Sequence, residues 1–258
     1  MQKHKDAFGQ LLEIMDELRA KCPWDKEQTL ESLRTLTIEE TYELADAIME
    51  NDLPEIKKEL GDLLLHIVFY AKIGSEKGAF DISDVIHNLN EKLIYRHPHI
   101  FGDVQVADAR EVSDNWEQLK LKEKGRKKSV LEGVPKSLPA IIKAHRIQDK
   151  VRGVGFDWDE KEQVWDKVAE EMQELKVELL KNPDSEEAEM EFGDLFFSLI
   201  NAARLYGINP ENALERTNLK FIKRFNYLEE KTLKLGIDLK TMPLAEMEKI
   251  WQEAKKED

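Results

Sequence analysis

The stretch "EETYELADAIMENDLPEIKKELGDLLL", from Glu39 to Leu65, decides the fold class. Its apolar residues recur every three or four positions, which is the spacing of one helix face. A short polar break with a proline, "NDLPE", divides it, and so short a connection makes two helices antiparallel neighbours. The stretch therefore predicts a helical pair over Thr37–Glu50 and Pro54–Lys72.

A second stretch repeats this arrangement: "EEMQELKVELLKNPDSEEAEMEFGDLFFSLI", from Glu170 to Ile200. The acids recur in the same order, displaced by 131 or 132 residues. Such a repeat indicates one structural unit written twice. The same reading predicts helices over Asp159–Lys181 and Ser185–Tyr206, and a third long helix in each half, around Leu89–Arg96 and Ala213–Glu230. We therefore expect an all-α protein with two tandem domains, each resembling a four-helix bundle.

The segment "KLKEKGRKKSVLEGVPKSLPA", from Lys120 to Ala140, is basic, contains Gly and Pro and loses the apolar period. It is typical of a linker. We place the domains at residues 1–125 and 126–258, and expect Ser137 to cap a new helix with Pro139 in its first turn.

Composition narrows the function classes. The 258 residues carry a formal net charge of -14, which argues against broad binding to nucleic-acid polymers or anionic membranes. Cys22 is the single cysteine, so an intramolecular disulfide or a cysteine-based zinc cluster is excluded. The sequence has no apolar run of about 20 residues for a membrane span and no signal-peptide pattern at its start. We expect a cytoplasmic protein.

The acids of each helical pair form a candidate metal site. Residues three apart share a helix face, so Glu40 and Glu43 project together, as do Glu59 and Asp62 on the next helix. The second copy offers Glu171, Glu174, Glu191 and Asp194. Ionised acids beside apolar helices are costly unless they are paired or bind a metal, and oxygen-only ligands suit Mg²⁺ or Mn²⁺.

Two other interpretations of these acids are open at this point. A di-iron bundle would carry histidine where these pairs have aspartate, and His66, which Ser198 replaces in the second copy, fits a satisfied core histidine better. The glutamates could instead form a solvated face, with Glu40 in a capping box begun by Thr37.

Gly61 and Gly193 lie inside predicted helices at a cost of about 1 kcal/mol each, and we expect a close approach of the neighbouring backbone there.

The motifs "EETYEL…ELGDLLL" and "EEMQEL…EFGDLFF" resemble the E-x-x-E…E-x-x-D signature of the MazG-type all-α nucleoside triphosphate pyrophosphohydrolases. The segments "CPWDKEQTLESL", "EKLIYRHPHIFGD", "EGVPKSLPA" and "VGFDW" are similar to other landmarks of the two-domain bacterial members. The resemblance covers almost the whole chain.

The resemblance implies Mg²⁺-dependent hydrolysis of nucleoside triphosphates between the α and β phosphates, for nucleotide-pool housekeeping with broad base specificity. It also implies that the C-terminal domain is catalytic and the N-terminal one structural or regulatory. The metal ligands would be Glu171, Glu174, Glu191 and Asp194, with a second set at Glu40, Glu43, Glu59 and Asp62. Glu170, or Glu39 in the first copy, would be the spare carboxylate that acts as general base or orients a ligand.

Basic and aromatic residues of both halves are candidates for holding the substrate. Lys220 and Arg224 share a helix face and would contact the outer phosphates, and Lys167 is a weaker phosphate candidate. Trp251 would stack on the base or anchor the last helix. The N-terminal counterparts are Lys92, Arg96 and Trp116.

The family's members generally assemble as dimers whose helices complete each site, so we expect a homodimer formed through the helix bundles. Two other functions stay open: a hydrolase of the same superfamily selective for dUTP or nucleoside diphosphates, and a non-catalytic helical module that senses nucleotides.

Overall fold

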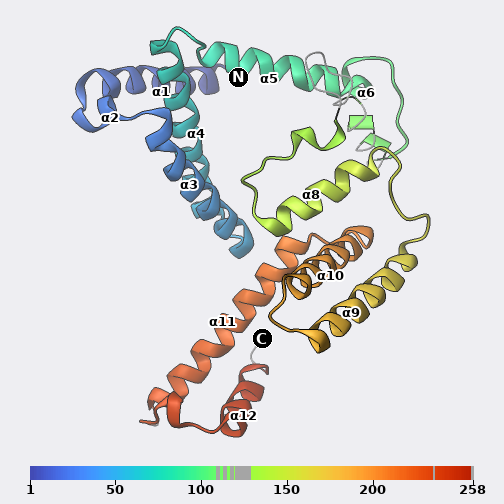
Figure 1. Ribbon diagram of the computed structural model, residues 1–258. Helices are drawn as coiled ribbons and strands as arrows, with labels where there is room; N and C mark the ends of the chain where they lie inside the picture. The colour runs from blue at the N-terminus through green and yellow to red at the C-terminus, as the bar shows by residue number, and fades with distance from the viewer. Residues whose placement is uncertain (109–110, 113–114, 117–118, 120–128, 235, 257–258) are drawn as a thin grey trace. The chain divides into compact units, whose positions relative to one another are not determined.

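The computed structural model describes residues 1–258 except 109–110, 113–114, 117–118, 120–128, 235 and 257–258 (Figure 1). The described residues form helices and turns and no strand, as the all-α prediction requires. They divide into two compact units, Met1–Val106 and Ala107–Asp258. The predicted boundary at residues 125 and 126 lies outside the described residues and stays a prediction.

The N-terminal unit is built around one antiparallel helical pair. Its helices are α1 (Gln2–Lys21), α2 (Pro23–Glu27), α3 (Leu30–Glu50), α4 (Leu53–Glu76), α5 (Ile82–Arg96) and α6 (Pro98–Phe101). Helices α3 and α4 pack along each other, and α1 and α5 contact α4. The core of this unit gathers Met15, Leu33, Val68, Phe69 and Ile73.

The C-terminal unit repeats the pair. Its helices are α8 (Ala140–Arg152), α9 (Val164–Lys181), α10 (Glu186–Leu205), α11 (Pro210–Lys234) and α12 (Leu244–Ala254), with short 3-10 turns at Val130–Gly133, Lys161–Gln163 and Leu239–Thr241. Helices α9 and α10 form the pair, and α8 packs against α10 as α1 packs against α4. Helices α11 and α12 pack on each other around Leu228, Met242 and Ile250.

Short polar side chains fix the starts of the paired helices. Thr29 and Ser32 cap α3 reciprocally, each accepting the other's backbone N–H, at 3.1 and 2.9 Å. Asp52 caps α4 and Ser185 caps α10, each accepting from the backbone N–H three residues on. Thr37 therefore lies inside α3, where its hydroxyl donates to the Leu33 carbonyl at 2.9 Å. The alternative of a capping box at Thr37 and Glu40 is wrong.

Two further predictions fail. Ser137 does not cap α8, because the residue at the N-cap is Pro139 and it supplies no side-chain hydrogen bond. A Cβ atom added at Gly61 or Gly193 would meet no heavy atom within 4 Å, leaving aside the helix's own nearby backbone. Among the described residues, no neighbouring backbone therefore comes close enough to either position to require a glycine.

None of the described helices has the length and apolarity that crossing a membrane requires.

Candidate functional site

Three carboxylates converge between α9 and α10 of the C-terminal unit. Glu171 and Glu174 project from α9 and Glu191 from α10, and each offers an oxygen within 4.8 Å of the other two. Glu171 is buried, Glu191 is half-buried and Glu174 is exposed, so the cluster opens on one side to solvent. The spacing of three along α9 and the short turn before α10 together produce this convergence.

The electrostatics of this cluster reflect its crowding. Burial raises the pKa of the Glu191 carboxyl, and the negative charges of Glu174, Asp194 and Glu171 raise it further. Asp194, one turn after Glu191, is exposed and lies outside the tight group of three. Its negative charge nevertheless raises the pKa of Glu191. Such a site favours a cation, which would offset both the repulsion and the burial.

The N-terminal unit holds the same cluster. Glu40 and Glu43 of α3 and Glu59 of α4 bring oxygens within 4.8 Å of one another. Burial raises the pKa of Glu40, and so do the charges of Asp62, Glu43 and Glu59, in that order. Both copies therefore assemble three glutamates, with the aspartate one turn further along the second helix.

Each acidic cluster contains one buried carboxylate oxygen that lacks a hydrogen-bond partner. These are Oε2 of Glu59 and Oε2 of Glu191, which occupy equivalent positions. An unpartnered buried carboxylate oxygen is costly, and a divalent cation would satisfy it. Oxygen donors alone fit a hard cation of the Mg²⁺ or Mn²⁺ kind. Neither described cluster contains the histidine that a di-iron site would use. His66 is buried as expected, but its Nδ1 has no partner.

A lysine accompanies each cluster, on opposite helices in the two copies. Lys167 of α9 contacts Glu171 at 2.7 Å and Glu170 at 2.8 Å, and the hydrogen bond to Glu170, followed by that to Glu171, raises the pKa of Lys167. In the first copy Lys58 of α4 contacts Glu59 at 2.7 Å and Glu55 at 2.6 Å. Lys167 thus ties the exposed Glu170 to a candidate metal ligand.

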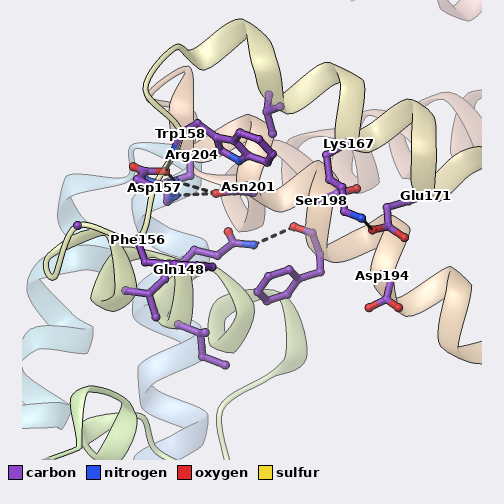
Figure 2. Close-up of a pocket in the computed structure, with 15 residues that line it drawn as sticks. Gln148, Phe156, Asp157, Trp158, Lys167, Glu171, Asp194, Ser198, Asn201 and Arg204 are labelled. Atoms are coloured by element: carbon purple, nitrogen blue, oxygen red, sulfur yellow. Dashed lines mark hydrogen bonds and ion pairs between the residues drawn. The ribbon is translucent and has the colours of Figure 1, made fainter.

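A cavity of about 560 Å³ begins at the acidic cluster of the C-terminal unit. Figure 2 shows Lys167, Glu171 and Asp194 at one end and Trp158, Gln148 and Asn201 towards the other. Apolar side chains of α8, α9 and α10 line much of its wall: Ile147, Val151, Val164 and Phe197. The cavity therefore joins a charged end to a largely apolar chamber, an arrangement typical of small-molecule sites.

An ion pair holds the loop that lines the end of the cavity away from the acidic cluster. Asp157 accepts from both terminal nitrogens of Arg204, the Nη1 contact measuring 3.0 Å. Arg204 also donates to the amide oxygen of Asn201, from Nε at 2.9 Å and Nη2 at 2.8 Å. Figure 2 shows this network beside Trp158. A bidentate carboxylate pair fixes geometry well, so the "VGFDW" segment is anchored to α10.

Gln148 lies buried in the wall of the chamber, with 3% of its surface exposed. Its Nε2 donates to the Phe197 carbonyl at 2.8 Å (Figure 2). Its Oε1 is buried without a hydrogen-bond partner. Gln148 and Asn201 were not predicted, because neither belongs to a sequence motif and α8 carries several other polar residues, so the inward face is known only from the structure.

The corresponding space in the N-terminal unit is filled. Repeat offsets of 131 to 133 residues pair Gln148 with Met15, Val164 with Leu33, Lys167 with Leu36 and Asn201 with Phe69. Met15, Leu33 and Phe69 are the buried centre of the N-terminal core, and Leu36 packs against them. The two copies thus share their acids but differ in the room beside them.

The structure does not bring the remaining predicted substrate residues to this cavity. Lys220 and Arg224 lie on α11 and Trp251 on α12, and none of the three lines the cavity. Trp251 packs against Phe221, with ring centres 4.9 Å apart, and Arg224 lies 5.9 Å above its ring. In the first copy Lys92 and Arg96 share α5, whereas Trp116 is exposed and belongs to the compact unit Ala107–Asp258.

Comparison with known proteins gives a consistent result. The family model for the MazG nucleotide pyrophosphohydrolase domain matches residues 28–101 and 160–228, one match on each helical pair. The chain is 45% identical to the nucleoside triphosphate pyrophosphohydrolase/pyrophosphatase MazG of Thermotoga maritima, over 96% of this chain and 95% of that protein. It is 41% identical to the nucleoside triphosphate pyrophosphohydrolase of Escherichia coli K12, over 97% and 98%. It is also 46% identical to the uncharacterized protein YabN of Bacillus subtilis, over 96% of this chain and 51% of that protein.

Proposed function

The chain belongs to the MazG nucleotide pyrophosphohydrolase family, and from that premise we propose that it hydrolyses nucleoside triphosphates at its C-terminal unit. The products are the nucleoside monophosphate and pyrophosphate, from cleavage between the α and β phosphates. The main support is that the C-terminal acidic cluster borders a cavity of about 560 Å³, whereas the equivalent N-terminal space is filled by core side chains.

The carboxylates hold the divalent cation in this proposal. Glu171, Glu174, Glu191 and Asp194 supply oxygens, and the unpartnered Glu191 Oε2 is the donor whose burial most needs a cation. When bound, Mg²⁺ or Mn²⁺ supplies positive charge for the phosphate oxygens and for the charge that develops on the leaving pyrophosphate. Without it, a triphosphate would be repelled from this cluster.

Glu170 is the candidate general base. It is exposed beside Glu171 and is held by Lys167 at 2.8 Å. A water that attacks the α phosphorus gives its proton to Glu170, while the bond from that phosphorus to the bridging oxygen breaks and pyrophosphate leaves. The hydrogen bond from Lys167 orients Glu170, and the Lys167 ammonium lies close enough to the cluster to contact a phosphate as well.

Lys220 and Arg224 remain the proposed contacts for the outer phosphates. They do not line the cavity of their own chain, so this role fits the proposed homodimer, in which α11 of a second chain would supply them. The packing of Trp251 on Phe221 and Arg224 favours an anchoring role for this residue over a base-stacking one.

Matched substitutions in the two copies test the proposal. We expect Glu174→Gln to lower hydrolysis by about 100-fold or more, because it removes one cation donor. Glu43→Gln, the same change at the equivalent N-terminal position, is expected to leave hydrolysis near the wild-type rate. The assay quantifies monophosphate and pyrophosphate with Mg²⁺, with Mn²⁺ and with EDTA.

Three results would contradict the proposal. Near-normal hydrolysis by the Glu174→Gln variant would contradict the assignment of the catalytic metal site to the C-terminal cluster. Release of inorganic phosphate instead of pyrophosphate would point to another cleavage position, and turnover confined to dUTP or to nucleoside diphosphates would favour the selective hydrolase of the same superfamily.

A further inference from the structure

We propose that Gln148 reads the nucleobase: its Oε1 accepts a hydrogen bond from a base N–H group seated in the cavity. The inference rests on the proposed function, since it assigns the chamber next to the acidic cluster to the nucleoside end of the triphosphate. It predicts a substrate class, namely triphosphates whose base carries an N–H donor on the edge that enters the chamber.

The orientation of the Gln148 amide follows from its partner. The Phe197 backbone carbonyl can only accept, so the atom 2.8 Å from it must be the amide nitrogen. This contact leaves Oε1 as the group that is not engaged, and Oε1 is buried without a partner. Helix α8 therefore holds a fixed, unsatisfied acceptor in the wall of the cavity (Figure 2).

The chamber suits a base by size and lining. A volume of about 560 Å³ falls within the range of small-ligand sites, roughly 300–1,000 Å³. Trp158 and Phe197 offer flat apolar surface, while Lys167, Glu171 and Asp194 mark the end where a cation and phosphates would lie. A buried acceptor costs free energy unless a ligand or water satisfies it, and a base N–H is the donor that a nucleoside brings to this depth.

The other copy supports the assignment. The residue equivalent to Gln148 is Met15, 1% exposed in the N-terminal core. Methionine fills the equivalent position there without any polar requirement. The chain therefore tolerates an apolar side chain at this helix position, and the glutamine stands in the copy that has a cavity.

Adenine, cytosine, guanine and uracil all carry at least one N–H donor, so a hydrogen bond to Gln148 Oε1 is compatible with hydrolysis of all the standard triphosphates. It discriminates against a base that lacks the donor. An acceptor left unsatisfied by such an analogue lowers kcat/KM by about 10-fold or more.

Paired substrates test the inference in the wild-type full-length protein. ATP is compared with purine riboside triphosphate, which lacks the 6-amino group, and CTP with the pyrimidin-2-one riboside triphosphate, which lacks the 4-amino group. We expect kcat/KM to favour the amino-bearing member of at least one pair by about 10-fold or more. Most of the difference should fall in KM, because the contact is remote from the reacting phosphorus.

The variant Gln148→Met, which installs the residue of the other copy, should bring that ratio close to one while pyrophosphate is still released. Gln10→Met is the control, since Gln10 is an exposed glutamine on α1, the helix that corresponds to α8. It should keep the wild-type ratio.

The outcomes separate the inference from the proposed function. A wild-type ratio near one for both pairs would overturn the role of Gln148 alone, whatever the variant does. A high ratio that persists in a folded Gln148→Met protein would also overturn it, because another group would then read the base. Absence of triphosphate hydrolysis by the wild-type protein would overturn the proposed function and this inference together.

Discussion

At the scale of single residues, equivalent carboxylates behave differently because their neighbours differ. Glu59 and Glu191 hold the same position, yet a hydrogen bond from Lys58 lowers the pKa of Glu59, whereas burial raises the pKa of Glu191. The residue equivalent to Lys58 in the second copy is Met190. The C-terminal cluster thus lacks a lysine on α10 and carries one on α9, where Lys167 lines the cavity beside Glu171.

The ion pair between Arg19 and Glu76 gives a pH-dependent prediction. Glu76 receives bonds from Arg19 Nε at 3.1 Å and Nη2 at 2.5 Å, and the hydrogen bond from Arg19 lowers the pKa of Glu76 from about 4.5. A carboxyl with a lowered folded-state pKa stabilises the fold above its unfolded pKa and loses that contribution as the pH falls through the folded value. We expect Glu76→Gln to cost about 1 kcal/mol at pH 7, a modest value because Glu76 is partly exposed.

The measurement is hydrogen exchange of the α4 amides at pH 7 and, corrected for intrinsic rates, near pH 3. The variant and the wild type should converge at the lower pH, where Glu76 is protonated in both the folded and the unfolded chain. A difference that persists at its full size near pH 3 would show that the effect is packing and not charge.

At the scale of helices, the sequence predicted the two antiparallel pairs well, because apolar spacing and a proline-containing break specify them locally. The predicted first residues of the helices were less accurate than the predicted pairing. Helix α3 begins at Leu30, before the predicted Thr37, since the Thr29–Ser32 cap lies further upstream. Helix α9 begins at Val164 after a 3-10 turn. The start of α3 depends on which of several short polar residues acts as the cap, whereas α9 has no side-chain cap and follows the 3-10 turn directly.

Two glycines of α4 lead to opposite predictions for the same substitution. A Cβ at Gly61 would meet nothing within 4 Å, whereas one at Gly74 would lie 2.7 Å from the ring of Phe80. We expect Gly61→Ala to stabilise α4 by about 1 kcal/mol, from helix propensity alone. Gly74→Ala should destabilise it by about 1 kcal/mol, because the Phe80 ring, which is 40% exposed, must be displaced from its contact with the helix.

Urea unfolding followed by circular dichroism, with local hydrogen exchange on α4, checks both signs. Each variant is the other's control, since both add one methyl group to the same helix. A loss of stability in the Gly61→Ala protein would indicate a neighbour at Gly61 that a single chain does not provide.

At the scale of the whole molecule, the duplication and the acidic clusters followed from the sequence, but the difference between the copies did not. The clusters need only helical spacing and a short turn. The cavity depends on how α8 packs against α10, and on whether Gln148 and Asn201 or their counterparts Met15 and Phe69 face inward. These are contacts between distant segments, which local periodicity does not specify.

The predicted homodimer belongs to this scale. An apolar groove of about 710 Å³ runs along α8, α10 and α11, and Phe196 and Leu214 in its wall are 59% and 47% exposed. Phe221 of α11 is 56% exposed. Contiguous apolar surface of this kind is typical of association sites, and α11 is also the helix that carries Lys220 and Arg224. A second chain at this groove would both cover the apolar face and bring those basic side chains towards an acidic cluster.

We therefore expect the wild-type protein to be a dimer by light scattering and Phe196→Glu to be monomeric, because a charge in the groove would have to be desolvated at the interface. The same variant should lose most triphosphate hydrolysis if α11 of the second chain completes the site. Leu180→Glu is the control: Leu180 is 89% exposed at the end of α9 and lies outside the groove, so both mass and hydrolysis should be unchanged. A monomeric Phe196→Glu protein with normal hydrolysis would leave the dimer standing but would require each chain to supply its own phosphate contacts, and Lys167 would then be the first residue to test.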